Sequence, residues 1–305
     1  MMEEKADSLK DLIKKRDKSR ITVCSIALNH LPADQAFPII KEAGYQKLDA
    51  HEKVHLQIFP DLCDPEALKA IAHENGLHIA NLGTYVGGGL LGRSVAYADH
   101  GWVVANPERF TSCGFSSDDP DELKTEFEQF QYTIDIAVLF GSYSIRIVPG
   151  NDQPDTIDKI VPWFKRAAEY AAEKNIYMAF ENHGDGIAGT PKYSVEFVEK
   201  VGSPYLGVLY EPANLMHDTG TDYRAALETM KDCIIHCHCK DCGPVDGGYE
   251  MQHFGEGAID FPWIIDRLDK IGYEGDIGLE YELHHPEPEA GIKKFYNDFV
   301  ALFDN

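Results

Sequence analysis

Short apolar runs alternate with longer amphipathic stretches along most of the chain. The runs are rich in Ile, Val and Leu, and Gly, Pro or Asn residues bound them. Short runs of this kind between helical patterns are typical of buried parallel strands. The pattern predicts strands at residues 21–26, 46–50, 78–84, 144–149, 177–181, 206–211, 234–240 and 276–281.

A helical pattern follows each predicted strand. The expected helices span about residues 32–43, 64–75, 120–140, 156–174, 192–201, 223–230, 261–271 and 291–302. Several begin with a capping side chain before Pro, as at Asp64-Pro65, Asp119-Pro120 and Thr190-Pro191. Strict alternation of strand and helix predicts an α/β fold, and the number of units predicts a closed (β/α)8 TIM barrel.

The ends of the barrel and one long connection stand apart from this repeat. Residues 1–17 predict an extra helix, so we expect an N-terminal extension over 1–18 and one barrel domain over 19–305. The connection from Tyr85 to Asp119, after the third strand, begins Gly-rich and carries the aromatic residues Tyr97, His100, Trp102 and Phe110. A loop this long in a compact domain is usually functional or disordered, and its aromatic content favours a lid or a subunit contact.

The charge balance excludes some partners. Lys and Arg total 28 against 51 Asp and Glu, so the formal net charge is −23. A surface that follows phosphates needs the opposite sign, so we expect neither nucleic acid nor an anionic membrane as a partner. The chain shows no apolar leader and no run of membrane-spanning length, which leads us to expect a cytoplasmic protein.

The seven cysteines do not have the spacing of a disulfide framework. Four of them cluster, at Cys233, Cys237, Cys239 and Cys242, so a zinc site is one interpretation. Cys237 and Cys239 alternate with two histidines on a predicted strand and should therefore face the surrounding helices. We favour buried structural thiols.

In each of the last four predicted strands, a short apolar run is followed by a residue that can bind a metal. These residues are Glu181, Glu211, His238 and Glu280. In a barrel the carboxyl ends of parallel strands converge, so three carboxylates and one imidazole would meet there. Such a group repels itself unless a cation lies between its members. Mostly oxygen ligands favour Mn²⁺, with Mg²⁺, Co²⁺ and Zn²⁺ as alternatives; the competing interpretation is four unrelated polar residues.

This ligand set indicates a reaction type. Three carboxylates overcompensate a dication, so the site suits a neutral hydroxy-ketone. The metal would act as a Lewis acid on the carbonyl and stabilise the enediolate formed on proton loss. A neighbouring carboxylate or imidazole would remove the proton.

Five motifs carry a resemblance to a known family. They are Phe180-Glu181-Asn182-His183, Gly207 to Asn214 (GVLYEPAN), His236 to Asp241 (HCHCKD), Gly255 to Asp260 (GEGAID) and Gly278-Leu279-Glu280. In this order and spacing, the chain resembles the sugar phosphate isomerase/epimerase group of the xylose-isomerase-like barrels over roughly residues 20 to 302.

The resemblance implies roles for the strand-end residues. The metal ligands would be Glu181, Glu211, His238 and Glu280. As in ketose 3-epimerases, Glu181 and Glu280 would also exchange the proton on opposite faces of the substrate. The position of Glu211 is usually Asp, so its longer side chain would shift the metal or leave the residue outside the ligand set. Asn214 matches a position that often contacts substrate.

His183 is a further catalytic candidate. It shares the inward parity of Glu181, and its Glu-Asn-His triplet is similar to one in group members that handle 3-keto sugars. These include the large subunits of C-glycoside deglycosidases, where the matching His looks like the base of an elimination. The alternative role is to fix the loop at residues 184–186.

Other inward or loop positions are expected near the substrate. Lys240, His253 and Arg146 are the predicted substrate contacts, although Lys240 could instead pair with a ligand carboxylate. Asp49 on the second strand and Arg146 on the fourth are inward candidates. His236 is predicted to be a hydrogen-bonded core residue, and Glu256 to shape its turn.

Four functions compete at this point. The first is a metal-dependent keto-sugar isomerase or epimerase. The second is a lyase on the same scaffold, which would cleave a 3-keto-C-glucoside by β-elimination or dehydrate a keto-inositol. A nuclease of the endonuclease IV type needs clustered zinc ions and a basic groove, and a non-catalytic scaffold would leave the ligands idle. We expect a sugar or glycoside substrate and a homo-oligomer, with or without a small second subunit.

Overall fold

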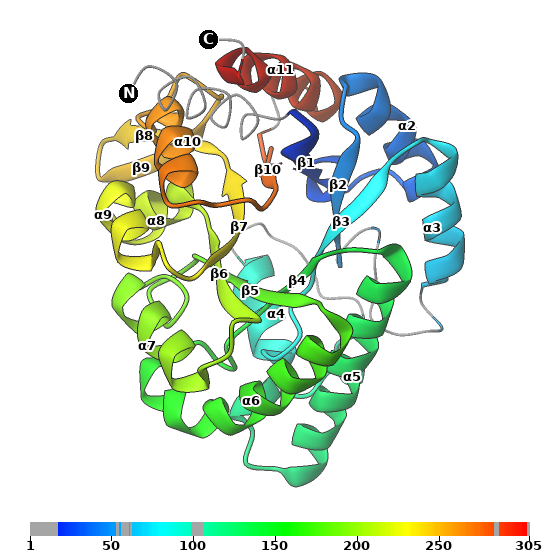
Figure 1. Cartoon of the computed structure of the whole chain (residues 1–305), viewed down its shortest axis with the longest axis vertical. Coiled ribbons are helices and arrows are strands. Elements are labelled where there is room, and N and C mark those ends of the chain that lie inside the picture. The colour runs from blue at the N-terminus through cyan, green and yellow to red at the C-terminus, as the bar shows by residue number, and fades with distance from the viewer. Residues whose placement is uncertain are drawn as a thin grey trace, which may run out of the picture.

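The computed structural model describes residues 18–52, 55, 61, 63–98, 106–283 and 287–303, and its centre is a closed barrel of parallel strands (Figure 1). Around the barrel the order is β1-β10-β7-β6-β5-β4-β3-β2, and β10 pairs with β1 to close it. The strands are β1 (Ile21–Cys24), β2 (Lys47–His51), β3 (His78–Gly83), β4 (Ser144–Ile147), β5 (Tyr177–Glu181), β6 (Leu206–Tyr210), β7 (Ile234–Cys239) and β10 (Ile277–Leu279). The predicted (β/α)8 barrel is confirmed.

Helices surround the strands on the outside of the barrel (Figure 1). The helices that match the predicted repeat are α2 (Ala33–Ala43), α3 (Pro65–Glu74), α5 (Pro120–Phe140), α6 (Ile157–Lys174), α7 (Pro191–Val201), α9 (Tyr223–Met230), α10 (Phe261–Lys270) and α11 (Pro288–Val300). Asp64 and Asp119 cap α3 and α5 through their side chains, as the sequence predicts. Thr190 precedes α7 but makes no side-chain cap.

The connection after β3 contains a helix that the sequence did not predict, α4 (Gly89–Ala98). The glycines before it look like loop signals, but tight packing requires them. Gly87 has a φ of +97°, and a Cβ on Gly88 would lie 2.7 Å from Val148 Cγ1. They therefore let α4 begin directly against the loop after β4. His100 and Trp102 lie outside the described residues, so the lid or subunit-contact role stays a prediction.

Two further elements were also missed. The helix α8 (Pro212–Thr219) follows β6 directly, and its first turn is capped by the Glu211 side chain. An antiparallel hairpin, β8 (Asp241–Val245) and β9 (Gly248–Gln252), follows β7 and turns at Gly247, whose φ is +95°. Short elements next to site residues have too few positions to show a period.

The first and eighth strands are shorter than the sequence predicts, and one predicted helix is not described. The strand at 21–26 ends at Cys24, where a 3₁₀ turn, η2 (Ser25–Leu28), begins. The eighth strand is limited to Ile277–Leu279 rather than 276–281. The predicted helix at residues 1–17 lies outside the described residues.

The core has an apolar outer layer and a polar interior. Large side chains such as Phe164 and Phe197 fill the space between strands and helices. Cys237 and Cys239 are buried in this apolar layer, which confirms that they face the helices. None of the described helices has the length and apolarity needed to cross a membrane.

Candidate active site

The four predicted metal ligands meet at the carboxyl-terminal end of the barrel. One ligand atom from each of Glu181, Glu211, His238 and Glu280 lies within 4.8 Å of the others. Ligand atoms about 2.0–2.3 Å from one ion lie within about 4.6 Å of one another, so this spacing suits a single cation. No cysteine belongs to a metal-ligand group in the described part of the chain.

Glu211 provides a test of whether these residues fit a cation. Its Oε1 accepts the Ala213 N–H at 2.8 Å, which caps α8. Its Oε2 is buried and has no hydrogen-bond partner among the described residues. Burial, with repulsion by Glu280 and Glu181, raises the pKa of Glu211 well above its usual range. A divalent ion would supply the missing partner and offset the repulsion, so the residues fit the metal.

Two buried cations each bind one carboxylate of the candidate ligand group. Arg146 Nη1 donates to Glu181 Oε2 at 2.5 Å. Lys240 Nζ donates to Glu280 Oε2 at 2.8 Å and to Glu282 Oε2 at 2.7 Å. Although burial raises the pKa of a carboxyl group, Arg146 and His238 hold the pKa of Glu181 well below its usual range. Glu181 therefore stays ionised.

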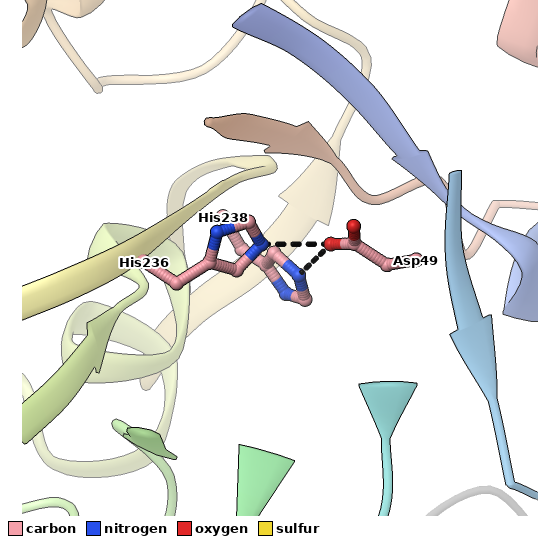
Figure 2. A group of neighbouring side chains, drawn as sticks. All are labelled: Asp49, His236 and His238. Atoms are coloured by element: carbon pink, nitrogen blue, oxygen red, sulfur yellow. Dashed lines mark hydrogen bonds and ion pairs between the residues drawn. The ribbon is translucent and has the colours of Figure 1, made fainter. Parts of the chain in front are cut away.

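Asp49 on β2 points toward the candidate ligand His238 and its neighbour His236, which come from β7 (Figure 2). His238 Nε2 lies 3.0 Å and His236 Nε2 lies 2.8 Å from the same oxygen, Asp49 Oδ2. Thr22 Oγ1 donates to Asp49 Oδ1 at 3.0 Å. In the structure His238 Nδ1 lies 3.2 Å from Glu181 Oε1 and can donate to it. With an ion bound, Nε2 would still donate to Asp49, and the Nδ1 lone pair would be available to the ion. A metal-binding imidazole needs this arrangement.

The Asp49, His236 and His238 side chains also lie within metal-ligand distance of one another. Hydrogen bonds already account for this group, because both Asp49 oxygens have donors and the Tyr143 hydroxyl bonds His236 Nδ1. His236 is thus the hydrogen-bonded core residue that the sequence predicts. Asp49 was an open candidate, because its inward position on a strand does not show which side chain it meets.

A cavity of about 380 Å³ opens next to the ligands. This volume is at the lower end of the usual range for small-molecule sites, about 300–1,000 Å³. Glu181 and Glu280 line it together with the predicted site residues Arg146, His183, Asn214 and Lys240. His253 is not among the described lining residues; its ring stacks on Tyr281 with the ring centroids 6.2 Å apart.

His183 lies in the cavity wall beside a carboxylate that the sequence did not reveal. Its Nδ1 is 3.0 Å from Asp218 Oδ2, which also accepts the Gly184 N–H at 2.7 Å. Burial alone would lower the pKa of His183, but Asp218 raises it above its usual value. Asp218 was missed because it lies on α8, which was itself not predicted.

Asp152 fixes the loop that follows β5. Its Oδ1 accepts the Ala188 N–H at 2.8 Å, and its backbone oxygen accepts the Ile187 N–H at 2.9 Å. A Cβ on Gly186 would lie 1.9 Å from that backbone oxygen, so only glycine fits there. Burial raises the pKa of Asp152 to about 7. The loop that carries His183 is thereby held at the cavity wall.

Comparison with known proteins agrees with this architecture. SgbU of Escherichia coli (strain K12), provisionally described as an L-ribulose-5-phosphate 3-epimerase, is 31% identical over 118 residues, covering 37% of this chain and 41% of that protein. The inosose dehydratase of Geobacillus thermodenitrificans is 27% identical over 141 residues, covering 41% of this chain and 47% of that protein. The chain thus spans less than half the length of these curated relatives.

Similarity in structure covers more of the chain. A solved D-tagatose 3-epimerase-like protein matches 93% of this chain and 98% of its own with a TM-score of 0.69, at 18% sequence identity, which shows a shared fold. A family model described as xylose isomerase-like TIM barrel matches residues 37–295. The chain therefore belongs to the xylose isomerase-like TIM barrel family.

Proposed function

We propose that the protein is a divalent-metal-dependent enzyme that removes a proton next to the carbonyl group of a keto-sugar, as an isomerase or epimerase. The observation that carries the proposal is the buried group Glu181, Glu211, His238 and Glu280, in which Glu211 Oε2 lacks a partner among the described residues. The sugar epimerase and dehydratase relatives support the same chemistry. Mn²⁺ is our preferred ion because the ligands are mostly oxygen.

The side chains around the cavity suit proton transfer. When bound, the ion would polarise the substrate carbonyl as a Lewis acid and balance the charge that develops on its oxygen. Glu181 and Glu280 come from opposite sides of the ligand group, and each has one oxygen held by a cation, Arg146 or Lys240. These contacts fix both carboxylates in place, and a fixed carboxylate near the substrate C–H can accept or return the proton.

Exchange of substrate hydrogen for solvent deuterium tests this proposal. The protein, loaded with Mn²⁺ and with its metal content measured, is incubated with a panel of ketoses in deuterated buffer and analysed by NMR. We expect deuterium at the carbon next to the carbonyl, and its loss after chelation with EDTA. No label on any ketose, with one Mn²⁺ bound per chain, would contradict the proposal.

A lyase is the second candidate, and the pair of His183 and Asp218 favours it. An imidazole backed by a carboxylate at 3.0 Å is a suitable base for elimination. In a 3-keto-glycoside this base would take the proton next to the carbonyl, a C=C bond would form, and the bond to the β-substituent would break. Leu91 on α4 and Met251 on β9 give the cavity apolar surface for an aglycone.

Release of a phenol separates the two candidates. The Mn²⁺-loaded protein is incubated with a 3-keto-glucoside of a chromogenic phenol and followed by absorbance, with any co-purifying subunit retained. Release that is lost in His183→Asn supports the lyase. Deuterium exchange into ketoses without phenol release supports the isomerase or epimerase.

A further inference from the structure

The charges of the cavity wall bear on the class of substrate. We propose that this site takes an uncharged polyhydroxy ketone and discriminates against sugar phosphates. This inference rests on the proposed function, because it concerns the substrate of the same site.

The lysine and arginine side chains at the cavity already form ion pairs with carboxylates. Among the described lining residues, the lysine and arginine side chains are Arg146 and Lys240. Arg146 is paired with Glu181 at 2.5 Å, and Lys240 is paired with Glu280 and Glu282 at 2.8 and 2.7 Å. To bind a phosphate, either cation would have to leave a carboxylate that it now neutralises. A phosphate site normally presents cations that such pairing does not already neutralise.

The outer part of the wall is acidic. Asp185 and Asp218 line it from the loop after β5 and from α8. Asp152, from the loop after β4, adds a carboxyl group that is only partly ionised at neutral pH, because burial raises its pKa to about 7. The two imidazoles beside them do not supply spare positive charge, because His183 and His217 both contact Asp218, at 3.0 and 2.8 Å. A phosphate dianion would therefore meet like charge in a partly enclosed space, where Coulomb repulsion is stronger than in water.

Backbone N–H groups of the same loops already donate hydrogen bonds within the protein. Many barrels bind phosphate with such groups at loops and helix N-termini. Here Gly184 N donates to Asp218 Oδ2 at 2.7 Å. Ile187 N and Ala188 N donate to Asp152 at 2.9 and 2.8 Å. What this wall offers instead is carboxylate oxygens, which accept hydrogen bonds from sugar hydroxyls.

The test compares free ketoses with their phosphate esters. The full chain, loaded with Mn²⁺, is titrated by calorimetry with L-ribulose, D-fructose and D-allulose and with the matching esters, and label uptake in deuterated buffer is followed in parallel. We expect at least one free ketose to bind at least about tenfold more tightly than its ester. The inference is overturned if an ester binds as well as its parent, or if no free ketose binds.

The two readouts keep this inference separate from the proposed reaction. Preferential binding of free ketoses without label uptake would support the inference about charge and count against proton exchange as the reaction. Label uptake with tighter binding of the esters would support proton exchange as the reaction and overturn the inference about charge.

A charge-reversal variant tests the cause of the preference. Asp185 is an exposed residue of the cavity wall, and Asp185→Lys places a cation there. We expect the ratio of ester to free-ketose affinity to rise at least about tenfold, which corresponds to one removed repulsion and one new attraction.

The matched control is Asp232→Lys, the same change in charge at an exposed residue before β7, at the opposite end of the barrel. We expect the ratio of ester to free-ketose affinity in this control to equal that of the wild type. If Asp185→Lys changes the ratio no more than this control does, the wall charge does not select the substrate, and the inference fails.

Discussion

Asp49 shows at the scale of one residue how a buried carboxylate organises the candidate metal centre. It is 1% exposed, yet its oxygens have donors from Thr22, His236 and His238. Burial would raise its pKa, but the two imidazoles hold the pKa of Asp49 far below its usual value. An ionised acceptor at this position fixes which nitrogen of His238 faces Glu181.

The substitution Asp49→Asn tests this role. The amide oxygen of Asn is neutral and a weaker acceptor than a carboxylate oxygen, so the two imidazole N–H groups that now share Asp49 Oδ2 would be held less firmly and His238 should lose its fixed orientation. We expect Mn²⁺ affinity, measured by calorimetry on the metal-free protein, to fall by about 10–100-fold. Thr22→Val removes only the bond to Asp49 Oδ1 and should keep an affinity near that of the wild type. Equal affinities for Asp49→Asn and the wild type would refute the orienting role.

The carboxyl group of Asp152 should make the free energy of unfolding depend on pH. Because burial raises its pKa to about 7, the folded protein holds a proton that the unfolded chain releases at the ordinary value of 3.8. The proton bound to Asp152 therefore adds its full contribution to the free energy of unfolding below about pH 4, and this contribution is lost as the pH rises through 7. Asp152→Asn keeps the acceptor for the Ala188 N–H and does not titrate.

Urea unfolding at pH 5 and pH 8 measures this effect. The free energy of unfolding of Asp152→Asn relative to the wild type should be higher at pH 8 than at pH 5, by on the order of 1–3 kcal/mol. A difference that is the same at both pH values would show that Asp152 does not titrate in this range.

At the scale of elements, one buried ion pair fastens α4 to the barrel. Arg93 is fully buried on α4, and its Nε donates to Glu52 Oε1 at 2.7 Å. The other oxygen of Glu52 accepts the Tyr85 N–H at 2.9 Å. The pair thus joins the end of β2, the start of the connection after β3 and the helix within it. This connection carries Leu91 to the cavity.

The substitution Arg93→Leu should leave the Glu52 carboxylate buried without its cation. We expect the free energy of unfolding in urea to fall by about 3–5 kcal/mol. Adding Glu52→Gln should recover part of that loss, because the amide oxygen can still accept the Tyr85 N–H. A single substitution that costs under about 1 kcal/mol would mean that the pair does not hold α4.

The elements differ in how well the sequence alone predicts them. The helix α5 and the strand β5 have the predicted bounds, Pro120–Phe140 and Tyr177–Glu181, because each has a clear period and clear stop signals. The helices α4 and α8 were missed. The glycines that α4 needs for close packing imitate a loop, and α8 is only 8 residues long. Tertiary packing, which a local pattern does not record, decides both.

At the scale of the whole molecule, a net charge of −23 makes the barrel a general attractor of cations, so specific binding must be distinguished from surface binding. A specific ion adds stability through mass action. With Mn²⁺ at about 100 times its dissociation constant, the free energy of unfolding should rise by about 2.7 kcal/mol, and EDTA should reverse the gain. Thermal unfolding at physiological salt measures this as an increase in Tm.

The matched variant for the thermal experiment is Glu211→Gln. Its amide oxygen can still accept the Ala213 N–H and cap α8, but the side chain can no longer ionise and give the ion a carboxylate ligand. The variant should fold and lose most of the gain in Tm from Mn²⁺. An equal gain in both proteins would indicate that Mn²⁺ acts at the acidic surface.

The sequence by itself determined the barrel and the positions of its four candidate ligands. Alternation of apolar runs and amphipathic stretches is a local property, and parallel strands in a closed barrel must bring their carboxyl ends together. Glu181 at the end of β5 and Glu280 after β10 therefore converge, whatever the details of packing. The parity of His236 and His238 on β7 likewise follows from the strand period alone.

Only the tertiary structure decided what those side chains meet. Asp49 and His238 are 189 positions apart, and the pairing of β2 with β3 shifts register between Leu48 and Asp49. A shift of this kind re-aims a side chain without a mark in the sequence pattern. His183 and Asp218 are likewise joined only by the packing of α8 against the loop after β5. Contacts across the barrel depend on register, helix position and rotamer, which are properties of the assembled fold.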